Sequence, residues 1–167
     1  MSVATIRPRL LRAFAVLLSL CPAAAMASGL VTNGGFESGP PMTPAGEIAI
    51  PAGSTSLANW TVGGGGVLFV SDIYWVPYQG ARSLTMNSTG PGSVSQTFAT
   101  APGASYSVGF VMSGEPFTSP AFKHLRVSAA GQSADYEFDT APAWHWDMAW
   151  ASHTWSFTAN APTTTLK

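Results

Sequence analysis

Apolar and polar residues alternate along most of this chain, between turns rich in glycine and proline. In residues 105–113, Tyr106, Val108, Phe110 and Met112 share one face, and small or polar residues take most of the other. This period of two predicts a half-buried β-strand. No segment has a convincing helical period. The same reasoning predicts further strands in the ranges 57–62, 67–74, 81–86, 93–99, 153–157 and from 163 onwards.

The clearest strand pair joins residues 123–128 to residues 133–139 through a turn centred on Ala130-Gly131. One register places apolar residues opposite each other on the inner face and cations opposite carboxylates on the outer face. A slip of one residue would destroy both matches. The predicted pairs are Leu125–Tyr136, Val127–Ala134, Arg126–Asp135 and His124–Glu137.

Strands at roughly ten-residue spacing, separated by glycine and proline, predict two packed antiparallel sheets. We therefore expect an all-β protein with a single antiparallel β-sandwich domain over residues 28–167. Residues 163–167 read as a strand that has just begun. We expect this domain to be incomplete at its C-terminal end and to lack its last strand.

Residues 1–27 have the pattern of a secretory signal peptide. An arginine-rich start precedes a short apolar run at 13–20, and Ala25 and Ala27 supply small residues at the cleavage site before Ser28. The alternative is a retained membrane anchor, but the apolar run is shorter than the ~20 residues that a spanning helix needs. The sequence predicts export, with a secreted or cell-surface location.

Removal of this leader changes the charge and the thiol content. The single cysteine, Cys21, lies within it, so residues 28–167 can form no disulfide and no thiolate metal site. Four basic residues then face eight acidic ones, a net charge of −4. Nucleic-acid binding needs clustered lysine and arginine, and this composition excludes it.

Five motifs occur along the chain in a recognisable order. They are Asn33-Gly34-Gly35-Phe36-Glu37, the block at 53–61, the block at 91–98, Ser113-Gly114-Glu115-Pro116, and the block at 155–159. In these motifs the chain resembles the bacterial choice-of-anchor C proteins, relatives of the plant cell-wall proteins that carry domain of unknown function 642. The resemblance implies a galactose-binding-like jelly roll, export, and attachment to a cell surface or extracellular matrix, and its plant members are associated with cell-wall polysaccharide.

The chain departs from this family in two places. Glu115 stands where the family usually has asparagine. The family also continues beyond the position of Lys167, through another strand to an Asp-Asn-Val motif that often precedes a sorting tail. Membrane attachment would therefore depend on export or on an anchor beyond the present C-terminus.

Related sandwich modules hold a structural calcium ion with an N-terminal carboxylate and nearby carbonyl groups. By this resemblance Asn33 and Glu37 are candidate calcium ligands, although calcium prefers six to eight oxygens and two residues supply too few. The alternative is a glycine turn in which the acid caps backbone amides. No other cofactor is expected.

Aromatic residues in loops are the candidate ligand contacts. Sugars present patches of C–H groups that stack on flat rings, and loops expose rings more often than strands do. Trp60 and Trp155 lie on predicted strands and are expected in the core. The alternative for the loop tryptophans is a plug folded over one end of the sandwich. The candidates are Tyr74, Trp75, Tyr78, Trp144, Trp146 and Trp150.

Catalysis is not expected. Asp135, Glu137 and Asp139 share a strand face at a spacing that glycoside hydrolysis would allow, but basic cross-strand partners favour a solvated surface. We expect a non-catalytic secreted or cell-surface module that binds carbohydrate or a cell-envelope polymer. The alternative is a structural or adhesive matrix protein with a protein partner and no sugar site. A polysaccharide-active enzyme is the third hypothesis.

Overall fold

A computed structural model describes residues 29–167, so the predicted signal peptide lies outside the described residues. This part of the chain contains strands and turns but no helix, and hence no helix that could cross a membrane. The all-β prediction is confirmed. The strands are β1 (Glu47–Ile50), β2 (Thr61–Gly64), β3 (Val67–Ser71), β4 (Arg82–Thr85), β5 (Gly92–Ala99), β6 (Ser105–Met112), β7 (Phe122–Ala129), β8 (Gln132–Asp139), β9 (Ala151–Thr158) and β10 (Thr163–Leu166).

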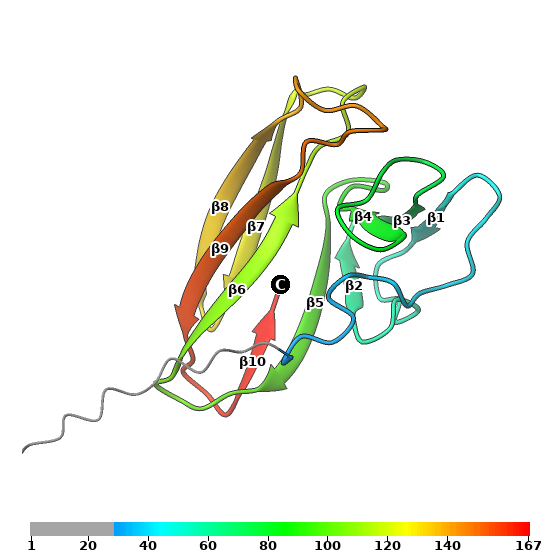
Figure 1. Ribbon diagram of the computed structural model, residues 1–167. Helices are drawn as coiled ribbons and strands as arrows, with labels where there is room; N and C mark the ends of the chain where they lie inside the picture. The colour runs from blue at the N-terminus through cyan, green and yellow to red at the C-terminus, as the bar shows by residue number, and fades with distance from the viewer. Residues whose placement is uncertain (1–28) are drawn as a thin grey trace, which may run out of the picture.

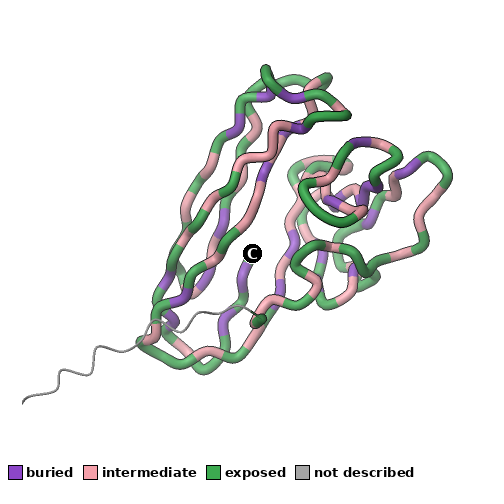
Figure 2. Tube along the Cα trace, viewed as in Figure 1, coloured by how far each residue is buried: buried purple, intermediate pink, exposed green. Residues whose placement is uncertain are grey.

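The strands form antiparallel sheets in the orders β1-β3-β4, β10-β5-β2, β6-β9 and β7-β8 (Figure 1). Two apolar clusters lie between them. The first packs β1 and β3 against β2 and β5, around Phe69 and Trp60. The second packs β6 and β9 against β7 and β10, around Phe157 and Leu166. The result is a β-sandwich whose buried positions follow the inner faces of the strands (Figure 2).

Strand β10 joins the two halves of the sandwich. It pairs with β5 from Thr163↔Ala99 to Leu166↔Gln96. On its other side, the backbones of Lys167 and Ser128 exchange hydrogen bonds of 2.8 and 2.9 Å, which links β10 to β7. Reciprocal bonds of this kind mark an antiparallel pair.

The predicted hairpin is confirmed residue by residue in β7 and β8. Leu125 lies opposite Tyr136, and Arg126 lies opposite Asp135. The Arg126 guanidinium donates to both carboxylate oxygens of Asp135, at 2.6 and 2.8 Å. Both faces of the hairpin therefore agree with the register that the sequence pattern predicts.

Two strand predictions differ from the structure, and one further strand lies where none was predicted. The strand predicted at 57–62 begins only at Thr61, because the backbone of Trp60 bonds back to Leu57 in a turn and Asn59 has a φ of 68°. The strand predicted at 67–74 ends at Ser71, where the backbone of Tyr74 closes another turn onto it. Strand β1 was not predicted, since four residues give too short a pattern.

The run of four glycines at 63–66 is divided between a strand and a turn, because Gly63 and Gly64 belong to β2. The turn that follows lies against the loop before β5. A Cβ added at Gly65 would lie 2.4 Å from the carbonyl oxygen of Gly90, and one at Gly92 would lie 1.9 Å from that of Gly66. Only glycine allows two backbones to approach so closely.

Candidate functional site

Three loops meet at one end of the sandwich: residues 72–81 between β3 and β4, 113–121 between β6 and β7, and 140–150 between β8 and β9 (Figure 1). We call these loops the rim. The amide of Val76 donates to the carbonyl of His145 at 2.8 Å, which connects the first loop to the third. The Ser113 hydroxyl donates to the Met148 carbonyl and connects the second loop to the third.

A carboxylate–imidazole pair lies inside the rim. Glu115 Oε1 and His145 Nε2 are 2.9 Å apart, with 16% and 28% of the two side chains exposed. The imidazole is surrounded by the rings of Phe117 and Tyr74, with centroids at 5.0 and 5.1 Å. Burial, and then the negative charge of Glu115, raises the pKa of the Tyr74 hydroxyl. The pair therefore connects two loops across thirty residues of sequence, and its imidazole packs against the rings of Tyr74 and Phe117.

The third loop presents its aromatic residues on a tight turn. Trp144 and Asp147 exchange backbone hydrogen bonds of 2.6 and 2.9 Å, which leaves His145 and Trp146 as the two central residues. Trp146 stacks on Trp144 at a centroid distance of 5.5 Å and an interplanar angle of 20°, and it is 73% exposed. Phe117 meets Trp144 edge to face at 5.5 Å. These three rings form a row in which Trp146 presents an open surface to solvent.

Of the six predicted contact residues, Tyr78, Trp144 and Trp146 are exposed on the rim. Tyr74 is half-buried, and so is Trp150, whose indole nitrogen donates to the Val76 carbonyl at 3.1 Å. These two rings support the rim from beneath and offer less surface to a ligand.

The expected exposure of Trp75 is wrong. Its side chain is only 6% exposed and packs with Val70 and Met148. The indole nitrogen donates to the Ser83 hydroxyl at 2.7 Å. A buried tryptophan that has a partner for its N–H is a core residue, so the ring of Trp75 is not available to a ligand.

The sequence did not reveal every residue of the rim. Phe117 is 60% exposed and extends the row of rings, and Ile73 and Val76 are also exposed. The sequence feature that could have pointed to the second loop was Glu115, because the resembling family usually has asparagine at that position. Its partner, His145, has no metal-ligand spacing around it, so no sequence signal indicated its role.

The segment that begins with Asn33 has a structural explanation. The Asn33 side-chain amide donates to the carbonyls of Ser38 and Ala58 at 2.8 and 2.9 Å, and the Asn33 carbonyl accepts from the Trp60 indole at 3.0 Å. The Glu37 carboxylate accepts from the amide of Ala81 at 3.1 and 3.2 Å. It also accepts from the amide of Arg82 at 3.2 Å. The segment therefore fastens the N-terminal region to the start of β4.

These contacts match the capping alternative. No group of three or more acidic, histidine or cysteine side chains suited to a metal occurs within residues 29–167. The side chains of Asn33 and Glu37 bond to backbone groups of the protein, and calcium binding there stays a prediction.

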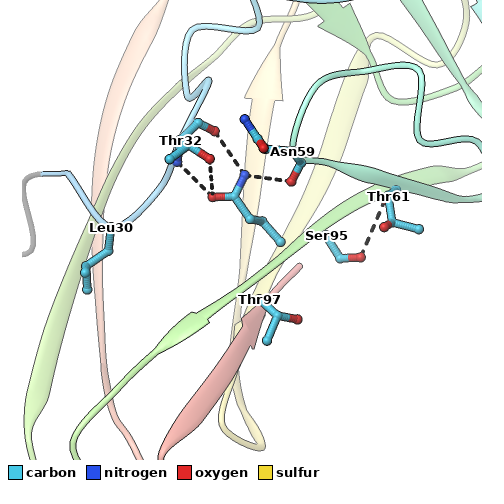
Figure 3. A pocket seen from close by; sticks show the side chains of 7 residues that line it. Leu30, Thr32, Asn59, Thr61, Ser95 and Thr97 are labelled. Atoms are coloured by element: carbon cyan, nitrogen blue, oxygen red, sulfur yellow. Dashed lines mark hydrogen bonds between the residues drawn. The ribbon is translucent and has the colours of Figure 1, made fainter.

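A polar hollow of about 390 Å³ lies elsewhere, between the N-terminal segment and β5 (Figure 3). Gln96 is one of the residues that line it, and the amide nitrogen of Gln96 donates to the carbonyls of Thr32 and Asn59 at 3.0 and 2.9 Å. Its amide oxygen accepts from the Thr32 amide at 2.8 Å. The polar groups of Gln96 are satisfied within the protein, and the hollow contains no rim residue.

The acidic face of β8 is exposed, as expected for a solvated surface. The hydrogen bond from Arg126 lowers the pKa of the Asp135 carboxyl. His124 Nδ1 lies 3.6 Å from Glu137. These carboxylates face basic partners across the hairpin, which is the arrangement of a surface ion-pair network.

The fold and the rim together define an all-β sandwich protein whose loops gather aromatic side chains at one end. The chain matches the family described as "Protein of unknown function (DUF642)" over residues 29–167, and it belongs to that family. No curated protein and no solved structure matches it. The narrower relation to the choice-of-anchor C proteins stays a prediction.

Proposed function

We propose that this protein is a non-catalytic, secreted or cell-surface module that binds carbohydrate or a cell-envelope polymer through the rim. The observation that carries the proposal is the exposed row of Phe117, Trp144 and Trp146. Monomeric proteins rarely expose clustered large apolar side chains without an interaction to serve. Flat rings beside polar groups suit a sugar, which offers C–H faces and hydroxyls together.

The rim is held firmly enough to act as a preformed site. Its loops are tied together by the Glu115–His145 pair and by the Val76–His145 backbone bond. Pre-organisation reduces the entropy that a site loses when it binds. Trp146 would stack on the sugar, and Tyr78 would add a second ring with a hydroxyl that can hydrogen-bond.

The proposal is tested by a glycan array followed by calorimetry on purified residues 28–167. Trp146→Ala should abolish or strongly weaken binding, whereas Trp155→Phe, on β9 and away from the rim, serves as the matched aromatic control. Binding that survives removal of Trp144, Trp146, Phe117 and Tyr78 together would refute the stacking mechanism.

A second candidate function uses the same rim to bind a protein. The observation that favours it is the exposure of Ile73 and Val76, at 71% and 48%, because aliphatic side chains contribute little to sugar recognition. In this reading the protein is a structural or adhesive component of an extracellular matrix. The variant Ile73→Ser/Val76→Ser would then abolish partner capture from matrix extracts, while glycan binding would depend on Trp146 alone.

A further inference from the structure

The charge of the rim bears on which glycan it accepts, and this argument rests on the function proposed above. The three rim loops contain Asp72, Glu115 and Asp147 but no lysine or arginine. A site for uronate, sulfate or phosphate groups normally offers guanidinium or ammonium groups. These loops instead offer carboxylates and no lysine or arginine side chain.

The cations closest in sequence to the rim already have partners. Arg82 Nη1 lies 3.8 Å from Asp72 and donates to the Ala81 carbonyl at 2.9 Å. The Lys123 ammonium donates to the carbonyl and the hydroxyl of Thr118, at 2.7 and 3.0 Å. Both cations therefore bond to protein groups, and Arg82 already lies near an acidic side chain of the rim.

Asp147 is placed to act as a polar contact beside the stacking ring. It follows Trp146 directly at the end of the tight turn, and its side chain is on the exposed side of the loop. Its Oδ1 accepts from the amide of Ala149 at 3.1 Å, which fixes the carboxylate. Its Oδ2 has no protein partner among residues 29–167. A fixed carboxylate with one free oxygen next to an exposed ring can accept hydrogen bonds from sugar hydroxyls.

We infer that the rim selects an uncharged glycan, with Asp147 accepting hydrogen bonds from sugar hydroxyls beside Trp146. The same carboxylate repels anionic sugars, since two like unit charges about 4 Å apart repel measurably even in water. Asp147 is thus both the polar contact and the residue that determines charge specificity. Binding of the uncharged ligand should change little with salt, because screening acts on pairs of charges.

The test compares ligands that differ only in charge. Hexamers of β-1,4-linked glucose, mannose and galactose are titrated beside the same hexamers oxidised at C6 to uronates, at low and at high ionic strength. At low ionic strength we expect each uronate to bind at least about fivefold more weakly than its neutral parent. High salt should bring the affinity of each uronate closer to that of its neutral parent, and should leave the affinity of the neutral hexamers unchanged.

Asp147→Asn then isolates the charge. The asparagine Oδ1 retains the bond to the Ala149 amide while the carboxylate is lost. Neutral hexamers should bind about fivefold to tenfold more weakly, because a hydrogen bond to a charged acceptor is stronger than one to an amide, and the gap between neutral and uronate ligands should close. The matched control is Asp139→Asn at the end of β8, where the Asp139 Oδ1 caps the Ala141 amide at 3.0 Å in the same way.

The outcomes separate this inference from the proposed function. If uronate hexamers bind as tightly as their neutral parents, and Trp146→Ala abolishes both, the function stands and the charge selection is overturned. If neither series binds and Trp146→Ala makes no difference, both are overturned. The wild-type comparison of ligands needs no variant, so it decides the charge selection even if Asp147→Asn fails to fold.

Discussion

The contact between Glu37 and Gly80 allows a sharp test of why the Asn33–Glu37 segment exists. Gly80 precedes the two amides that the Glu37 carboxylate caps and has a φ of +71°. A Cβ added there would lie 2.1 Å from Glu37 Oε1. The variant Gly80→Ala therefore combines backbone strain with loss of the carboxylate from its site.

The expected magnitudes follow from these contacts. Glu37→Ala removes hydrogen bonds from two exposed amides to a charged acceptor, and should lower the free energy of unfolding by about 1–2 kcal/mol. A left-handed alanine costs roughly 1–2 kcal/mol by itself. Gly80→Ala should therefore lower the free energy of unfolding by about 2–4 kcal/mol, because it combines the backbone strain with the loss of the hydrogen bonds to Glu37.

The double variant distinguishes this account from independent effects. Once Glu37 is alanine, Gly80→Ala has only its backbone strain to add, so the double variant should be about 1–2 kcal/mol more stable than additivity predicts. Gly53→Ala is the matched control, because Gly53 has a φ of +81° and its added Cβ would meet nothing within 4 Å. The assay is urea denaturation followed by tryptophan fluorescence. Strict additivity, or equal costs at Gly53 and Gly80, would refute the reasoning.

Three further predictions address the core, pH and metal. Trp75→Ala should lower the free energy of unfolding by about 3–5 kcal/mol, whereas Trp146→Ala should change it by no more than about 0.5 kcal/mol; equal losses in thermal melts would contradict the two assignments. Because the Arg126 hydrogen bond lowers the pKa of Asp135 in the folded state, the stability that this carboxyl contributes is present above its ordinary pKa and is lost as the pH falls through the lowered value. The stability difference between wild type and Asp135→Asn should therefore shrink on acidification, and a difference that grows would be inconsistent with the ion pair. Since Glu37 already accepts backbone amides, adding calcium or EDTA should leave the melting temperature unchanged, and a clear rise with calcium would revive the metal site.

The hairpin of β7 and β8 shows how much local pattern can predict. Its partners lie within twenty residues, both faces carry complementary pairs, and a short turn at Ala130 and Gly131 joins them. The sheets themselves were harder to predict. The position of β10 between β5 and β7 depends on contacts some forty to seventy residues distant, and no pattern in four residues specifies those neighbours.

The candidate site was predictable in composition but not in arrangement. The sequence shows that loop rings are abundant, and three of the six chosen are exposed. It does not show which ring turns inward, since Trp75 and Tyr78 are three residues apart in the same loop. Trp75 is buried against Val70 and Met148, and its indole bonds to Ser83, a partner that becomes adjacent only when β4 pairs with β3.

The placement of β10 has a consequence for biosynthesis. Leu166 lies in the apolar cluster that β6, β7 and β9 share, and its strand connects that cluster to β5. The sandwich therefore cannot close while the ribosome is still adding the preceding residues, however early the first strands emerge. If the protein is exported, as we propose, a chain that stays open until β10 has been made could still be threaded through a translocon.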